Sequence, residues 1–179
     1  MLKVLRIISS PLGIIYWFIT RIRNWCFDKN IFPATKVNAK VISVGNLTVG
    51  GSGKTPATMM IAEILKTENV KTGLLSRGYG RSSAGYIHVS DGINIKVSVD
   101  QCGDEMYFMA DELKVPAAVA ERRVEGADRL IKDSRLDAII LDDAFQHRWI
   151  YRNTDVVIID QRFLVNIGQM EQRLLPLGS

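Results

Sequence analysis

Short apolar segments alternate with longer amphipathic segments along most of the chain. Continuous apolar segments of about four to eight residues are typical of strands buried on both faces, whereas apolar residues three or four apart are typical of helices. The pattern predicts strands at residues 41–44, 72–76, 86–89, 93–99, 115–120, 138–141 and 156–159, and helices at residues 10–27, 55–66, 104–113 and 124–132. Because strands alternate with helices, we expect an α/β fold with a mostly parallel sheet flanked by helices.

One pair of predicted strands departs from this order. Residues 93–99 alternate strictly between Ile or Val and polar side chains, and Asp91-Gly92 separates them from the apolar segment 86–89. An Asp-Gly pair between two strands is typical of a tight hairpin turn. We therefore expect an antiparallel β-hairpin inserted into the α/β fold.

The N-terminal segment is rich in Leu, Ile, Trp and Phe. Ser10-Pro11 predicts the start of a helix, with Ser10 as the N-cap and Pro11 in the first helical position, and the helix is expected to extend to about Phe27. Its apolar part is too interrupted for a transmembrane span of about 20 residues, and no small-residue cleavage site follows it. Two arrangements remain: an amphipathic helix in a membrane interface, or a helix packed against its own domain.

The distribution of charge favours the membrane. The formal net charge of the 179 residues is +4, yet residues 1–40 contain seven Lys or Arg and one acid, so the rest of the chain is slightly acidic. A basic segment with tryptophans and a tyrosine is typical of an anionic membrane surface, and the acidic remainder argues against nucleic acid as a partner. Cys26 and Cys102 form no metal-binding pair and are typical of a reducing compartment.

A glycine-rich segment between the strand 41–44 and the helix 55–66 carries the main chemical motif. It reads Thr48-Val49-Gly50-Gly51-Ser52-Gly53-Lys54-Thr55. Glycines let backbone N–H groups surround an anion, and the start of the helix adds partial positive charge. In such a P-loop, Lys54 would contact the β- and γ-phosphates and the Thr55 hydroxyl would coordinate Mg²⁺. Thr48 stands where the common pattern has glycine, and the remainder matches the variant core Gly-Gly-x-Gly-Lys-Thr.

Paired carboxylates follow the strand 138–141. Asp142 and Asp143 at the end of an apolar strand fit the acidic partner of a P-loop, holding Mg²⁺ directly or through water. The plainer alternative is a solvated strand end. Gln146 and His147 follow at once, and they would orient a phosphate or the acceptor, although a single histidine is more often structural.

Acidic and basic residues begin or follow other predicted elements. Asp104 and Glu105 open the helix 104–113, where acids either favour the helix dipole or serve as a base and a metal ligand. Arg77 lies in a glycine-bounded loop after the strand 72–76, either as a phosphate contact or as part of an exposed basic turn. Arg123 begins a helix, which is unfavourable for a cation on dipole grounds unless an anion lies nearby.

Taken together, these motifs resemble the tetraacyldisaccharide 4′-kinase family of lipid A biosynthesis. The matching blocks, in the family's order, are residues 10–16, 44–56, 75–81, 103–105, 123, 142–147 and 175–178. The extension Gly-Asn-Leu-Thr-Val-Gly-Gly and the block Asp-Asp-x-Phe-Gln-His are specific to this family. The resemblance implies a P-loop NTPase-like fold and transfer of the γ-phosphate of ATP to the 4′-hydroxyl of a tetraacyldisaccharide 1-phosphate, with ATP and Mg²⁺ as cofactors.

The resemblance also implies residue roles and a location. It implies catalysis by Asp104, Lys54 and Asp143, metal binding by Thr55, Glu105, Asp142 and Asp143, and nucleotide or site contacts by residues 48–55, Arg77, Arg123, Gln146 and His147. Asp104 is the acid that would help to deprotonate the sugar hydroxyl. The protein is expected to be peripheral on the cytoplasmic face of the bacterial inner membrane, with the lipid disaccharide as substrate.

The expected organisation has two parts. Residues 1–40 would form the membrane-associating helix and connector, and residues 41–179 the P-loop kinase domain, while a second domain typical of the family has no counterpart in these residues. Two other functions stay open: a membrane-peripheral P-loop ATPase switch, or nucleotide binding without catalysis. Val49 stands where switch ATPases usually have lysine, which argues against the first of these. The oligomeric state is not indicated.

Overall fold

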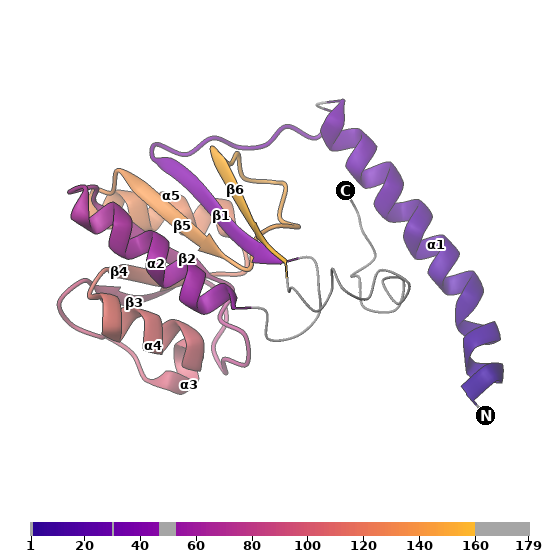
Figure 1. Cartoon of the computed structure of the whole chain (residues 1–179), viewed down its shortest axis with the longest axis horizontal. Coiled ribbons are helices and arrows are strands. Elements are labelled where there is room, and N and C mark those ends of the chain that lie inside the picture. The colour runs from indigo at the N-terminus through magenta and orange to yellow at the C-terminus, as the bar shows by residue number, and fades with distance from the viewer. Residues whose placement is uncertain (1, 30, 47–52, 160–179) are drawn as a thin grey trace.

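A computed structural model describes residues 2–29, 31–46 and 53–159 of the chain (Figure 1). The helices are α1 (Leu2–Asp28), α2 (Lys54–Thr67), α3 (Val99–Cys102), α4 (Asp104–Leu113) and α5 (Arg123–Ser134). The strands are β1 (Lys40–Asn46), β2 (Thr72–Ser76), β3 (Ile87–Asp91), β4 (Pro116–Val119), β5 (Ala138–Asp142) and β6 (Thr154–Ile158). Nearly all of these elements coincide with the predicted segments to within a few residues.

The six strands form one sheet in the order β3-β4-β2-β5-β1-β6. Every neighbouring pair is parallel except β3 with β4. Val44 of β1 lies opposite Asp142 of β5, and Ser76 of β2 lies opposite Val119 of β4. The carboxyl ends of the four central strands therefore meet at one edge of the sheet, and the predicted mostly parallel sheet is confirmed.

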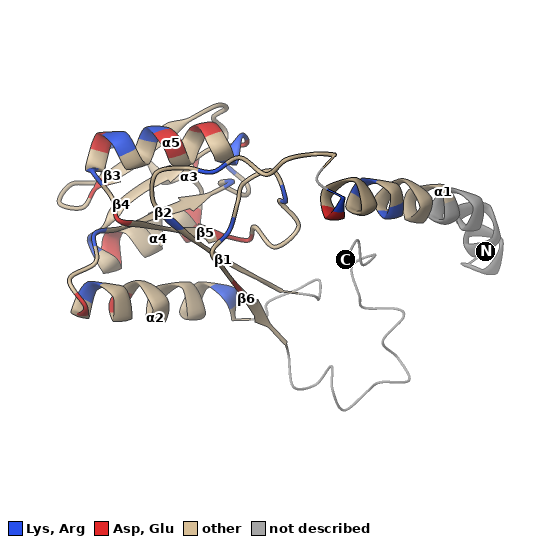
Figure 2. Cartoon of the chain, turned by 90° about the horizontal axis from the view of Figure 1, so that it is seen from above, with Lys and Arg blue, Asp and Glu red and all other residues tan. Residues whose placement is uncertain are grey.

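Helices cover both faces of the sheet. Leu74 and Ile140 pack with α2 and α4 on one face, whereas Leu75, Ile139 and Leu141 pack with α5 on the other. Figure 2 shows α5 on one side of the strands and α2 with α4 on the opposite side. Successive residues of β2 and β5 lie on alternate faces, and both strands are buried along their whole length.

The predicted hairpin is wrong in its second strand. Residues 93–99 form no strand, and Ile95 makes a single bridge to Ser90, while β3 pairs with β4 instead. Asp91 is the last residue of β3, and its Oδ1 accepts hydrogen bonds from the N–H groups of Ile93 and Asn94 at 2.9 and 2.8 Å. Of the alternating side chains, Ile95 and Val97 pack against the α4 side of the core, whereas Ile93 and Val99 are exposed.

Helix α1 is longer than predicted. It begins at Leu2, so Ser10 is not its N-cap, and it ends at Asp28 as expected. Proline lacks an N–H group, which removes one intrahelical hydrogen bond, and the helix continues through Pro11 despite this loss. Within the described part of the chain, none of the helices combines the length and the hydrophobicity that crossing a bilayer requires.

Candidate functional site

The start of α2 lies at the edge of the sheet where β1 and β5 end. Gly53 precedes the helix with φ of 79°, a left-handed conformation that glycine adopts without strain. Lys54 is the first helical residue, and its Nζ lies 3.6 Å from Oδ1 of Asp143 and 3.4 Å from Oδ1 of Asn46. Thr55 follows in the same turn, half-buried. The other predicted loop residues, Thr48, Val49, Gly50, Gly51 and Ser52, lie outside the described residues.

The two carboxylates after β5 have very different surroundings. Asp142 is only 2% exposed, and its Oδ1 accepts a hydrogen bond from the hydroxyl of Thr58 at 3.2 Å. Burial, together with the charges of Asp143 and Glu105, raises the pKa of Asp142 to about 6, although Thr58 and Lys54 oppose the rise. Asp143 is exposed and has φ of 51°. A cation between such carboxylates would relieve their repulsion.

The acidic groups alone do not form a metal site. Among the described residues, no three His, Cys, Asp or Glu side chains are gathered closely enough to hold a metal ion. Mg²⁺ commonly takes one or two carboxylates together with phosphate oxygens and water. The buried Asp142 and the adjacent Asp143 would supply these one or two carboxylates.

Arg123 is buried at the first position of α5. It is 4% exposed, one Nη donates to the carbonyl of Ala120 at 2.6 Å, and its buried Nε has no hydrogen-bond partner among the described residues. Burial, followed by the charge of Arg77, lowers the pKa of Arg123 to about 10, whereas Asp143 and Asp142 act in the opposite direction. A buried cation at a helix N-terminus with a free N–H is typical of an anion-binding position.

His147 is half-buried, and the charges of several arginines act on it. Burial, together with the charges of Arg123, Arg152 and Arg77, lowers the pKa of His147 to about 4. The imidazole is therefore neutral at physiological pH. It can orient a phosphate or hydroxyl through one N–H and one acceptor nitrogen, but it carries no charge to neutralise an anion.

The loop that carries His147 is held close to the P-loop strand. A Cβ on Gly45 would lie 2.5 Å from Cβ of Phe145, so only glycine fits at the end of β1. Arg152 donates to the carbonyl of Phe145 at 2.7 Å, and the N–H of Ala144 donates to the carbonyl of Val44 at 3.3 Å. These contacts bring the loops after β1 and β5 together.

Asp104 and Glu105 begin α4 beside the loop after β2. Gly103, with φ of 86°, packs so closely that an added Cβ would lie 2.7 Å from the carbonyl oxygen of Tyr79. The Asp104 carboxylate accepts a hydrogen bond from the N–H of Glu105 at 2.9 Å, and both side chains are exposed. The charge of Glu105 is one of the causes that raise the pKa of Asp142, after burial and Asp143. Gln146 is exposed in the loop after β5.

Comparison with known proteins identifies the family of the chain. The family model for tetraacyldisaccharide-1-P 4′-kinase matches residues 5–179. The chain belongs to the tetraacyldisaccharide 4′-kinase family. It is 39% identical to the tetraacyldisaccharide 4′-kinase of Aquifex aeolicus over 98% of this chain and 54% of that protein. It is also 39% identical to that of Chlorobium luteolum, over 88% of this chain and 46% of that protein.

A solved structure from the same family shares the fold. The crystal structure of LpxK from Aquifex aeolicus, described as an apo form in complex with ATP, aligns with a TM-score of 0.82 and 38% identity. The alignment covers 96% of this chain and 52% of the crystallised chain. The chain thus spans about half the length of the tetraacyldisaccharide 4′-kinases that it matches.

Two residues of this site were missed by sequence reasoning. Asn46 accepts a hydrogen bond from Lys54, and Thr58 donates one to Asp142. Thr58 lies one helical turn after Lys54, so its spacing placed it on the same face of α2, but the sequence does not reveal which carboxylate it meets. In this member of the tetraacyldisaccharide 4′-kinase family, α2 therefore contacts both acids: Lys54 pairs with Asp143, and Thr58 donates to Asp142.

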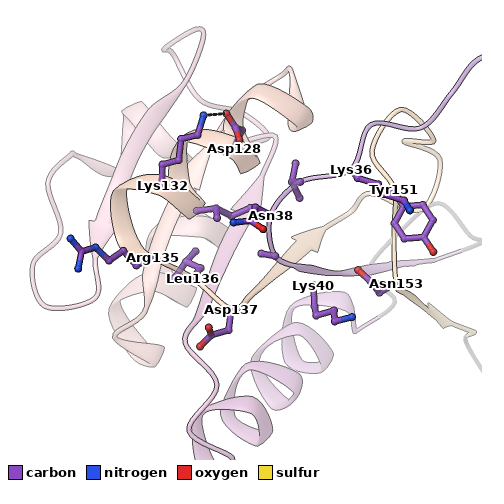
Figure 3. A pocket seen from close by; sticks show the side chains of 13 residues that line it. Lys36, Asn38, Lys40, Asp128, Lys132, Arg135, Leu136, Asp137, Tyr151 and Asn153 are labelled. Atoms are coloured by element: carbon purple, nitrogen blue, oxygen red, sulfur yellow. Dashed lines mark hydrogen bonds and ion pairs between the residues drawn. The ribbon is translucent and has the colours of Figure 1, made fainter.

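A cavity of about 980 Å³ lies elsewhere, at the opposite edge of the sheet. Figure 3 shows residues from the second half of α5, the segment after it, the segment leading into β1 and the segment before β6 around it, with Lys132 paired to Asp128. Its lining includes Lys36, Lys40 and Tyr151 but none of the predicted site residues. The candidate site and this cavity are therefore separate, and the site is identified by the side chains of its loops.

The pKa of Asp142 predicts how stability depends on pH. Its folded pKa of about 6 exceeds the unfolded value of 3.8, so the folded state binds more protons between these values and loses stability as the pH rises through them. In EDTA, Asp142→Asn should gain stability relative to the wild type by roughly 2–3 kcal/mol between pH 4 and pH 7. Urea unfolding at each pH measures this difference, and parallel pH profiles would contradict it.

Proposed function

We propose that this chain binds ATP with Mg²⁺ and acts in transfer of the γ-phosphate to the 4′-hydroxyl of a tetraacyldisaccharide 1-phosphate. The observation that carries the proposal is the contact of Lys54 with Asp143 at the ends of two adjacent strands, with buried Asp142 beside it. A lysine at a helix start facing paired carboxylates is the arrangement by which P-loop enzymes hold a triphosphate and its metal. The relatives from Chlorobium luteolum and Aquifex aeolicus are both named tetraacyldisaccharide 4′-kinase.

Each side chain would take a distinct part. Lys54 would contact the β- and γ-phosphates, and Arg123 and Arg77 would neutralise phosphate charge as it develops. Asp104 would accept the proton of the 4′-hydroxyl as its oxygen attacks the γ-phosphorus and the bond to the β–γ bridging oxygen breaks. His147, neutral because of burial and nearby arginines, and Gln146 would orient the acceptor or a phosphate by hydrogen bonding.

The carboxylates and one hydroxyl would hold the metal. Asp142, Asp143, Glu105 and the Thr55 hydroxyl are the candidate ligands, acting directly or through water. When bound, Mg²⁺ neutralises phosphate charge. The raised pKa of Asp142 reflects burial and carboxylate repulsion, both of which a cation would offset.

We further propose that residues 1–40 attach the kinase domain, residues 41–179, to the cytoplasmic face of the inner membrane. The side chains of Ile15, Trp17, Phe18, Ile19 and Trp25 are all about half exposed on α1. An exposed helix with tryptophans and nearby bases suits a lipid interface, where the rings pack among acyl chains and the bases meet anionic headgroups.

Charge placed on α1 should weaken membrane attachment. Burying one large apolar side chain contributes about 1.5–3 kcal/mol, so Trp17→Glu should lower the affinity for anionic vesicles roughly tenfold or more. Met60→Glu, on the exposed face of α2, is the matched control because Met60 is equally exposed but lies on the kinase domain. Vesicle co-sedimentation measures both, and unchanged binding of Trp17→Glu would count against attachment through α1.

The activity itself is tested with the full-length protein. Radiolabelled γ-phosphate should appear on the lipid when ATP, Mg²⁺ and tetraacyldisaccharide 1-phosphate are supplied together. Normal ATP binding without any lipid product would refute the proposal. Nucleotide-dependent dimerisation in the absence of lipid turnover would instead identify a switch ATPase.

A further inference from the structure

The last turns of α1 present one face to the rest of the molecule. Thr20, Asn24 and Phe27 are buried, and their spacing of four and three residues places them on the same side of the helix. Residues 15–19 are exposed, and Figures 1 and 2 show this part of α1 projecting away from the sheet and its helices. Among the described residues, the contacts that set the orientation of α1 therefore lie at its C-terminal end.

Three aromatic rings meet at that end. Phe27 packs edge-to-face on Trp149 at 4.9 Å between centroids, and Phe32 lies 5.6 Å from Phe27 and 5.4 Å from Trp149. Phe27 is 7% exposed, whereas Phe32 and Trp149 are 36% and 47% exposed, so the two outer rings shield Phe27 from water. Such ring pairs have preferred angles and therefore restrict rotation as well as separation.

Arg148 adds polar contacts to the same face. One Nη lies 2.7 Å from the carboxylate of Asp28, the other donates to the carbonyl of Asn24 at 3.4 Å, and the guanidinium lies 5.1 Å from the centre of the Phe27 ring. The Asp28 pair is partly exposed and is worth little alone, but three contacts from one planar group fix the direction of the helix end. We call the set Asn24, Phe27, Asp28, Phe32, Arg148 and Trp149 the α1 joint.

The domain side of the α1 joint is firmly held. The N–H of Thr35 donates to the carbonyl of Trp149 at 2.8 Å, and the N–H of Tyr151 donates to the carbonyl of Thr35 at 2.8 Å. Ile150, between the two bonded residues, is buried in the core on the α5 side of the sheet. Trp149 is thus anchored on both sides by the fold rather than by α1.

The α1 joint and the candidate site share one short loop. Residues 143–150 run from Asp143 to the anchored Ile150, and His147 directly precedes Arg148. The N–H of His147 donates to the carbonyl of Ala144 at 2.9 Å, which closes a turn between the two ends. Arg148 of this loop contacts Asn24 and Asp28 of α1, so the helix end lies against the loop.

We infer that Arg148 and Trp149 are positioning residues that fix the angle of α1 to the kinase domain, so that a helix lying in the membrane holds the loop of Asp143 and His147 at the lipid headgroups. The inference rests on the proposed lipid-kinase function, which requires a site in the protein to meet a hydroxyl in the membrane surface. A rigid joint keeps the acceptor and the site aligned, and misplacement by about 1 Å can lower a rate by roughly 100-fold.

The rigidity of the α1 joint is measured directly, without any enzymatic activity. Spin labels at Arg21→Cys on α1 and Lys132→Cys on α5 of the full-length protein, with Cys26→Ser, report the distance between helix and domain. The wild type and Trp149→Phe should give one narrow distribution, while Trp149→Ala and Arg148→Ala broaden it. Trp17→Ala, the same change at an exposed position of α1, should not. A broad wild-type distribution, or a narrow one in Trp149→Ala, would overturn the joint.

Kinetics then test whether the joint positions the site. With lipid substrate in vesicles, Trp149→Ala should lower kcat about 10- to 100-fold, with the nucleotide affinity and vesicle binding within about twofold of the wild type. Trp149→Phe should restore most of the rate. A broadened distance with unchanged kcat would overturn the positioning role. If the wild type turns over no lipid, the proposed function fails, while the distance measurement still decides the α1 joint.

Discussion

Lys54→Ala should lower lipid phosphorylation by about 10²- to 10³-fold, the range for losing one preorganised contact to developing charge. Lys54 lies at the first position of α2, and its ammonium already faces Asp143 at 3.6 Å and Asn46 at 3.4 Å. A triphosphate bound at this helix start would meet the same ammonium. The loss should therefore appear as weaker ATP binding and slower turnover together.

The fold should tolerate this substitution. The ion pair of Lys54 joins a carboxylate that is largely exposed, and such pairs contribute at most about 1 kcal/mol. Lys66→Ala is the matched control, since Lys66 lies in the last turn of the same helix and donates to the carbonyl of Leu113 at 3.1 Å. Isothermal titration with ATP and thermal unfolding separate the two effects. Unfolding of Lys54→Ala, or equal activity loss in the control, would contradict the assignment.

The sheet could be predicted from the sequence because its central strands are buried on both faces. Leu74 and Leu75 and the contiguous apolar residues 138–141 lie in strands that are buried along their whole length, which left little choice of structure. The chain reversal at Asp91-Gly92 was predicted correctly, but the second strand of the hairpin was not, because a loop with alternate side chains against a core shows the same alternation as a strand. Ile95 and Val97 pack in that way.

The candidate site was predicted in its residue types but not in its geometry. Adjacent acids in a sequence give no indication of which one is buried, and the structure buries Asp142 and exposes Asp143. Thr58 and Asn46 become site residues only because α2 starts where β1 and β5 end. The α1 joint depends on Phe27 meeting Trp149 across more than a hundred residues, and no local pattern encodes such a contact.

Asp104→Asn should lower turnover by about 10²- to 10⁴-fold, the usual contribution of a general base, and leave ATP affinity unchanged. Asparagine has the same shape and keeps an oxygen to accept the 2.9 Å hydrogen bond from the N–H of Glu105, so the start of α4 should stay intact. What is lost is the capacity to accept a proton from the sugar hydroxyl. The effect should thus fall on kcat, in contrast to Lys54→Ala.

The plainer role of Asp104 is stabilisation of a helix N-terminus, and the same variant distinguishes the two. A dipole contribution is about 0.3–1 kcal/mol of stability with no change in rate. Asp100→Asn is the matched control, because Asp100 is an exposed acid in the first turn of the neighbouring α3. Steady-state kinetics with thermal unfolding measure both quantities. If Asp104→Asn loses stability as the control does and keeps full kcat, Asp104 is a helix-stabilising residue, and the proton must be accepted by another group.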